Sequence, residues 1–192
     1  MGYRPIGLLI LGLGNLLCED DGLGVAAVRR LQERYDFPEG VSVLDGGTLG
    51  LGLLPYIEDA ERVILIDAIR DEGPAGSFVR LTGDDVGPAV ANRLSVHQVG
   101  VVDLLDAARW TGHLPEALIL LGLVPQSLEL SVDLSPPLLA RLDDLVERVV
   151  EEARQLGYGP SPRKTAAGVI RSRRNETRYP LQQQTRPRRR SS

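Results

Sequence analysis

Short runs of apolar residues alternate along this chain with amphipathic segments of helical period. Three of the runs, Leu8–Leu11, Val63–Ile66 and Ala117–Leu121, are apolar at every position. Such runs are typical of parallel strands, because helices cover both faces of a parallel sheet. Val41–Leu44 is a further strand-like run. The alternation predicts a three-layer α/β fold, in which a twisted, mainly parallel sheet of about five strands has helices on both faces.

The segments between these runs predict helices and one edge strand. Ser77–Leu81 alternates polar and apolar residues, which is typical of a strand with one exposed face. Ser135 followed by Pro136 is a common helix start, and a glycine commonly follows a helix end. The predicted helices run from Asp21 to Tyr35, from a cap at Thr48 to about Ile57, from just after His97 to just before Gly112, and from Pro136 to Gly157.

Charge divides the chain into an acidic body and a basic end. Residues 159–192 contain 10 Lys and Arg against 1 acidic residue, whereas residues 1–158 contain 12 against 25. The basic end lacks hydrophobic periodicity, so it has little apolar surface to offset the entropy that folding would cost. We therefore expect a single α/β domain over residues 1–158 and a basic tail over residues 159–192 that is disordered from about Pro160.

Composition also restricts the partners and the cellular location. No run approaches the roughly 20 apolar residues needed to cross a bilayer, and no secretory signal opens the chain. An acidic body repels nucleic acid. Cys18 is the single cysteine, which excludes an intramolecular disulfide and a Cys-rich metal site. We expect a cytoplasmic protein whose partners include neither membrane nor nucleic acid.

Acidic side chains follow three successive predicted strands. Asp21 lies in the loop after the first strand, Asp45 directly follows the second, and Asp67 directly follows the third. His97, one of two histidines, precedes a predicted helix. Ligands of parallel sheets bind outside the carboxyl ends of the strands, where such loops converge. We therefore expect these four side chains to gather at one edge of the sheet.

Two carboxylates and an imidazole form a mixed oxygen and nitrogen ligand set that divalent nickel or zinc accepts. Each Asp taken singly is also explained as a turn residue or a helix cap. Glu19 and Asp20 are alternative carboxylates in the first loop. Competing signatures are incomplete, because Leu17 replaces the third glycine of a dinucleotide-binding loop and the His-Glu-x-x-His signature of zinc peptidases is absent. The combination predicts a metal site.

The same residues carry a resemblance to a protein family. The motifs are Gly12-Leu13-Gly14-Asn15, Asp20-Asp21-Gly22-Leu23-Gly24, Leu44-Asp45-Gly46-Gly47-Thr48, Leu65-Ile66-Asp67-Ala68, Ser95-Val96-His97-Gln98 and the stretch from Gly122 to Glu129. Together they resemble the hydrogenase maturation endopeptidases, over a region from about Leu8 to Gly157. The resemblance implies a twisted sheet flanked by helices, which agrees with the fold predicted above.

The resemblance also implies a function and a set of site residues. Asp21, Asp67 and His97 match the nickel-contacting positions of the family, and Asp45 matches a position needed for activity. The family often has Glu at the first position, so the shorter Asp21 changes the reach of that ligand. The implied substrate is the precursor of a nickel-iron hydrogenase large subunit, whose C-terminal extension is removed after nickel insertion. The implied metal is nickel carried by that substrate and coordinated transiently.

Three alternatives remain open at this point. The same ligands could hold a resident zinc or nickel in a hydrolase of another kind. A non-catalytic chaperone could bind the nickel site of the precursor without cutting it. The basic tail could bind nucleic acid, which would require a steep salt dependence of binding.

Overall fold

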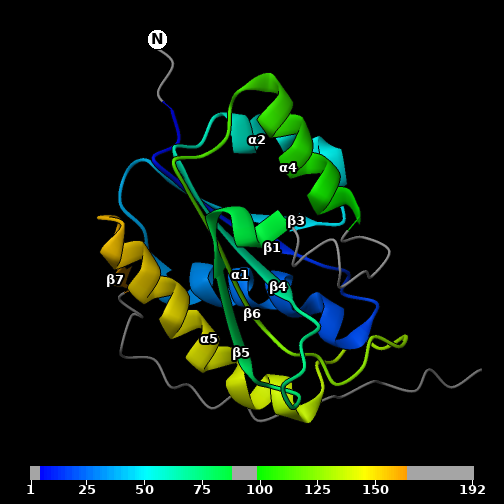
Figure 1. Cartoon of the computed structure of the whole chain (residues 1–192). Coiled ribbons are helices and arrows are strands. Elements are labelled where there is room, and N and C mark those ends of the chain that lie inside the picture. Colours follow the sequence, from blue (N-terminus) through cyan, green and yellow to red (C-terminus); the bar gives the residue numbers. More distant parts are fainter. Residues whose placement is uncertain (1–4, 88–98, 164–192) are drawn as a thin grey trace, which may run out of the picture.

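The computed structural model describes residues 5–87 and 99–163, which form a five-stranded sheet between two layers of helices (Figure 1). The strands of this sheet are β1 (Leu8–Leu13), β3 (Val41–Gly47), β4 (Arg62–Ala68), β5 (Phe78–Thr82) and β6 (Ala117–Leu123). The helices are α1 (Leu23–Arg34), α2 (Leu54–Glu58), α4 (Val99–Thr111) and α5 (Pro136–Gln155), with 3-10 helices η1 (Glu19–Gly22), η2 (Gly50–Leu53) and η3 (Gly83–Asp85). None of the helices within these ranges is both long and apolar enough to cross a membrane.

The strand order is β3-β1-β4-β6-β5, with β1, β3, β4 and β6 parallel and β5 antiparallel to β6. This order confirms the predicted three-layer α/β fold, and β5 is the edge strand predicted at Ser77–Leu81. The four parallel strands end at one edge of the sheet, which we call the carboxyl edge. The last strand residues there are Leu13, Gly47, Ala68 and Leu123.

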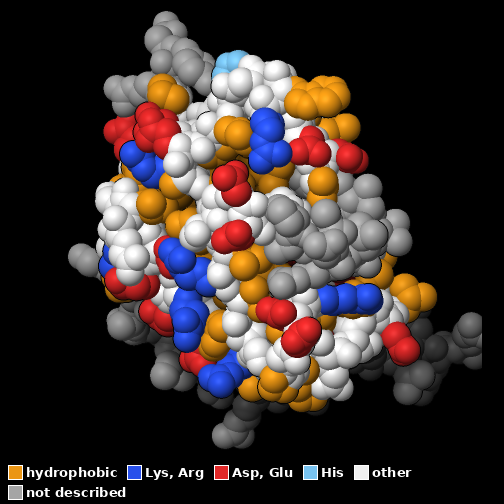
Figure 2. Space-filling model, in the orientation of Figure 1, with side chains coloured by type: hydrophobic (Ala, Val, Ile, Leu, Met, Phe, Trp, Pro, Cys, Tyr) orange, Lys and Arg blue, Asp and Glu red, His pale blue; other side chains and the backbone are white. Residues whose placement is uncertain are grey.

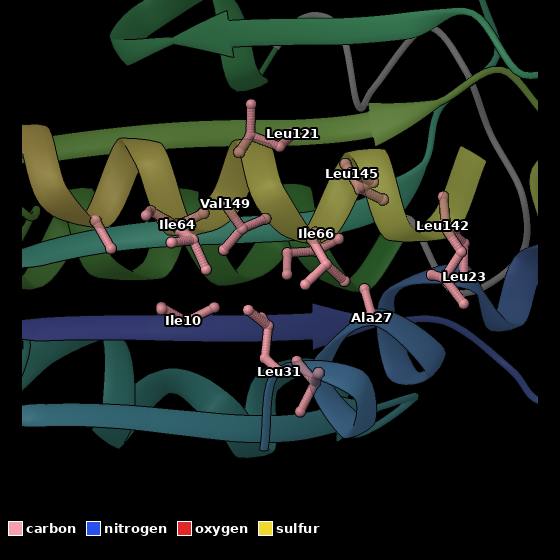
Figure 3. Close-up of a cluster of buried hydrophobic side chains, with 14 of the residues drawn as sticks. Ile10, Leu23, Ala27, Leu31, Ile64, Ile66, Leu121, Leu142, Leu145 and Val149 are labelled. Atoms are coloured by element: carbon pink, nitrogen blue, oxygen red, sulfur yellow. The ribbon is translucent and has the colours of Figure 1, made fainter. Parts of the chain in front are cut away.

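Each face of the sheet packs against its own helices. On one face, α1 and α5 cover residues such as Ile10 and Ile66 (Figure 3). On the other face, α2 and α4 cover the intervening residues, such as Leu9 and Leu65. All four of these side chains are fully buried, which explains why the strand sequences are apolar at every position. Each buried aliphatic side chain contributes roughly 1.5–3 kcal/mol to folding.

The outer surface of α5 and β5 is charged. Figure 2 shows basic and acidic side chains interspersed over this face. The guanidinium carbons of Arg141 and Arg148 lie 5.5 and 4.0 Å from the ring centroid of Phe78. Arg80 of β5 pairs with Glu152 of α5, with 2.5 Å between Nε and Oε1. These contacts fasten α5 to the edge strand of the sheet.

Three predicted helices differ from the observed ones at their ends, and the helix expected from Pro136 to Gly157 ends two residues earlier, at Gln155. The predicted helix from Asp21 to Tyr35 begins as the separate turn η1, and Tyr35 belongs to the short strand β2 (Tyr35–Asp36). Thr48 does not cap the next helix, because the chain turns at Gly50, whose φ of 53° favours glycine, and enters η2 first. Regular α-helix begins at α2, with Pro55 in its first turn. Backbone N–H groups of a first turn have no acceptor within the helix, so proline, which lacks this group, loses no hydrogen bond there.

The first residues of the predicted tail pair with the domain. β7 (Ser161–Pro162) runs antiparallel to β2, and Arg163 Nε lies 2.8 Å from Asp36 Oδ1. This ladder and ion pair hold residues 161–163 against the domain. Residues 164–192 lie outside the described ranges, so the division into domain and tail stays a prediction.

Candidate functional site

The first turn of α1 sits directly on the ends of β1 and β4. A Cβ atom on Gly24 would lie 2.2 Å from the carbonyl oxygen of Ile66 and 2.4 Å from that of Leu13, and one on Gly12 would lie 2.2 Å from the carbonyl oxygen of Gly24. These approaches are too close for any side chain, so glycine is required at both positions. The contact brings η1, immediately before α1, against β4 at the carboxyl edge.

Asp21 of η1 is buried beside the end of β1. The residue is only 2% exposed, and its Oδ2 accepts a hydrogen bond of 2.9 Å from the backbone N–H of Asn15. The loop doubles back tightly here, because a Cβ on Gly14 (φ 123°) would lie 1.7 Å from the carbonyl oxygen of Asp21. The loop therefore holds Asp21 at the carboxyl edge, as the sequence predicted.

Asp67 is buried near the end of β4, in the centre of the sheet. The residue is 3% exposed, and its Oδ1 accepts a hydrogen bond of 2.7 Å from the N–H of Ala68. It lies opposite Gly122 of β6, where a Cβ would approach the Asp67 carbonyl oxygen to 2.1 Å. β4 neighbours β1 and contacts η1, so Asp21 and Asp67 reach the same edge from adjacent strands.

Asp20 has a different environment from its neighbour Asp21. It is fully buried, and its carboxylate accepts four hydrogen bonds from the loop after β6 and from the residue before α5. The donors are Ser135 N (2.8 Å), Ser135 Oγ (2.8 Å), Gln126 N (2.7 Å) and Ser127 N (3.2 Å). Asp20 therefore clamps η1 to the loop after β6 and to the start of α5.

Asp45 occupies the same edge but lies at the surface. Its side chain is 41% exposed and its Oδ2 lies 3.5 Å from a guanidinium nitrogen of Arg29. The register between β1 and β3 shifts here, with Gly12 opposite Asp45 and Leu13 opposite Gly47. The irregularity lies at Asp45 and Gly46, and the Asp45 side chain is exposed whereas Asp21 and Asp67 are buried.

His97 lies outside the described residues, so its predicted place beside the two buried Asp residues stays a prediction. α4 begins two residues later, at Val99, and packs against η2 after β3. Within residues 5–87 and 99–163, no group of three His, Cys, Asp and Glu side chains is arranged to hold a metal ion. The predicted three-residue ligand set therefore depends on His97.

Two polar features of this edge were not predicted from the sequence, and both involve the contact between Asp20 and Ser135. One is the Asp20 clamp, whose donors are more than 100 positions away. The other is the role of Ser135, which stands at the N-cap of α5 as predicted but makes no side-chain cap bond and donates its hydroxyl to Asp20. Cys18 is half-buried, and its Sγ accepts a bond of 3.3 Å from Asn15 Nδ2, which is a structural contact within the loop.

Comparison with known families and proteins gives one consistent result. The family model described as hydrogenase maturation protease matches residues 25–152. The hydrogenase 2 maturation protease of Escherichia coli K12 is 37% identical over 158 residues, covering 82% of this chain and 96% of its own length. The hydrogenase expression/formation protein HoxM of Azotobacter vinelandii is 40% identical over 161 residues, covering 78% and 77%.

Solved structures show the same likeness. The hydrogenase maturating endopeptidase HybD from Escherichia coli superposes with a TM-score of 0.79 at 37% identity, covering 82% of this chain and 98% of that one. The [NiFe] hydrogenase maturation protease HybD from Thermococcus kodakarensis superposes with a TM-score of 0.64 at 31% identity, covering 77% and 99%. Similarity in sequence and similarity in fold to these proteases thus each extend over about four fifths of this chain.

Proposed function

Because the chain belongs to the hydrogenase maturation protease family, and is therefore a hydrolase of peptide bonds, we propose that it removes the C-terminal extension of a nickel-iron hydrogenase large-subunit precursor. The proposed substrate form is the precursor that already carries nickel, and the proposed location is the cytoplasm. The observation that carries the proposal is the pair of buried carboxylates, Asp21 and Asp67, at adjacent strand ends.

Asp21 and Asp67 suit the recognition of a cation. Carboxylate oxygens are ligands that divalent metal ions accept, so two carboxylates at one edge of the sheet suit a positively charged ligand. We assign them, together with His97, as ligands that complete the coordination of the nickel ion held by the substrate. An ion held by these residues near the scissile bond would polarise the carbonyl group and make it more reactive toward water.

Asp45 is assigned to the cleavage step. Its side chain is exposed, in contrast to the buried pair, so water reaches this carboxylate, which we assign as the base for the attacking water. The guanidinium of Arg29 lies 3.5 Å from Asp45 Oδ2 and pairs with this carboxylate at the surface.

The proposal is tested by incubating the full chain with nickel-loaded and nickel-free precursor and measuring the product masses by mass spectrometry. We expect the C-terminal peptide to be released from the nickel-loaded precursor alone. Uncut precursor in both reactions would remove the assignment as a processing endopeptidase. Cleavage of both forms would remove nickel as the recognition element.

A pair of matched variants tests the site. Asp67→Asn keeps the size of the side chain and the acceptor for the Ala68 N–H, so the fold is preserved. We expect processing to fall by roughly 100-fold or more, since even outer-shell changes at metal sites cost roughly 10–100-fold. Glu116→Gln, at an exposed position before β6, is the control and should process at the wild-type rate. Equal rates for the two variants would contradict the assignment of Asp67.

A further inference from the structure

Three large apolar side chains stand exposed together beside the carboxyl edge. Leu17 is 61% exposed, Leu130 is 88% exposed and Val132 is 72% exposed. We call these three residues the apolar rim. Leu17 lies in the loop after β1 and the other two in the loop after β6, yet the two loops run side by side (Figure 1). A single exposed leucine needs no explanation, whereas a cluster of apolar side chains in water marks a contact surface.

Hydrogen bonds hold the rim in place. Cys18 and Ser131 form a parallel bridge, in which Glu19 N donates to Ser131 O (2.8 Å) and Ser131 N donates to Leu17 O (3.1 Å). The Ser131 hydroxyl also accepts a bond of 3.3 Å from Asp133 N. The backbone is therefore satisfied within the loops, and the apolar side chains are held outward. A surface fixed before binding loses little conformational entropy when a partner arrives.

The rim adjoins the candidate site through covalent and hydrogen-bonded links. Leu17 precedes Asp21 by four residues in the same loop. The buried Asp20, next to Asp21, anchors Gln126 and Ser127 at the start of the loop that carries Leu130 and Val132. A chain that lies on the rim is therefore brought close to the two buried carboxylates.

The charges in the two loops that carry the rim have one sign. Residues 14–23 and 125–135 contain Glu19, Asp20, Asp21, Glu129 and Asp133 and no Lys or Arg. Glu129 and Asp133 are exposed and bracket the segment of Leu130 and Val132. Complementarity therefore favours a partner with apolar side chains flanked by Lys or Arg.

We propose that the apolar rim is the docking surface for the polypeptide substrate, where it contacts an apolar segment of the precursor that is flanked by basic residues. This inference rests on the proposed function, because the precursor is the protein whose scissile bond must reach Asp21 and Asp67. The rim supplies affinity, whereas the carboxylates act at the bond that is cut. Changes to the rim should therefore alter KM and leave kcat near its original value.

The test uses the double variant Leu130→Ser and Val132→Ser in the full chain. We expect KM for nickel-loaded precursor, and the Kd for immobilised precursor, to rise by roughly tenfold or more, since apolar anchors at the centre of an interface carry much of its affinity. The kcat should stay within about twofold and the melting temperature unchanged, because both residues are exposed. Trp110→Ser is the matched control: this side chain is 90% exposed in the last turn of α4, at the opposite end of the helix from the site.

The outcomes separate this inference from the proposed function. A wild-type protein that cleaves the precursor, with KM and Kd unchanged in the double variant, overturns the docking surface and leaves the function standing. A wild-type protein that binds the precursor without cutting it refutes the proposed cleavage, and weaker binding by the double variant would still support the docking surface. An equal rise of KM in the Trp110→Ser control would overturn the assignment to the rim.

Discussion

The carboxylate of Asp20 accepts hydrogen bonds of 2.8 Å from both the backbone N–H and the hydroxyl of Ser135, which lies 115 residues further along the chain. This contact joins the loop after β1 to the first residue before α5. It also places a negative charge at the amino end of α5, where the helix dipole favours it. Because Asp20 directly precedes Asp21, the clamp determines where the candidate ligand stands.

Asp20→Asn should destabilise the fold. The substitution keeps the volume but replaces one acceptor oxygen with an NH₂ group, which would face N–H donors of Gln126, Ser127 or Ser135. We expect a loss of about 2–3 kcal/mol in the free energy of unfolding, measured by urea denaturation, since hydrogen bonds to charged groups are worth about 1.5–3 kcal/mol each. Asp133→Asn, exposed in the neighbouring loop, should change the value by less than about 0.5 kcal/mol. Equal stabilities for the two variants would show that the clamp is dispensable.

Gly24→Ala should be destabilising, although the same change elsewhere in a helix is usually favourable. Ala stabilises a helix interior by about 0.8–1.0 kcal/mol relative to Gly. Here the added Cβ would meet backbone carbonyl oxygens at 2.2 and 2.4 Å, which cannot move without shifting β1 or β4. We expect a net loss of roughly 2–3 kcal/mol in the free energy of unfolding, from overpacking. Gly52→Ala, whose Cβ would meet its nearest atom at 3.8 Å, is the control, and an equal loss there would contradict the steric account.

Tyr35 should make stability depend on alkaline pH. Its hydroxyl donates a hydrogen bond of 2.5 Å to Glu147, and this bond, followed by burial of the ring, raises the pKa of Tyr35 above 10.0. A raised pKa in the folded state adds stability that is complete below pH 10.0 and is lost as the pH rises through the folded pKa. Tyr35→Phe should therefore cost about 1 kcal/mol at pH 7, and the deficit should shrink above pH 10. Urea unfolding of both proteins across that range measures it, and a deficit that is constant with pH would refute the linkage.

The fold was predictable because its information is local. Leu8–Leu11 and Val63–Ile66 report in their own sequence that both faces of a strand are covered, and the observed sheet places all eight residues in the core. The site was predictable in its broad position, since Asp21, Asp45 and Asp67 all follow or end parallel strands. The different surroundings of the acidic residues at this edge could not be predicted. The hydrogen-bond partners of Asp20, for example, lie 106 to 115 positions away in the sequence, and no local pattern marks them. The same holds for β7, whose pairing with β2 depends on contacts made only once the domain has folded.

Removal of metal from the purified protease should leave its activity intact. The two carboxylates come from separate elements, Asp21 from η1 and Asp67 from the end of β4, and oxygen ligands alone hold nickel less firmly than imidazole or thiolate ligands do. A single histidine added to such a pair makes a weak resting site, so most of the affinity for nickel must come from the substrate. We therefore expect the full chain, treated with a chelator and then desalted, to cleave nickel-loaded precursor at the untreated rate. The same treatment applied to the precursor should abolish cleavage, and mass spectrometry of the products measures both reactions. A protease that loses activity after chelation and recovers it with added zinc or nickel would instead contain a resident metal, and the assignment of nickel to the substrate would fail.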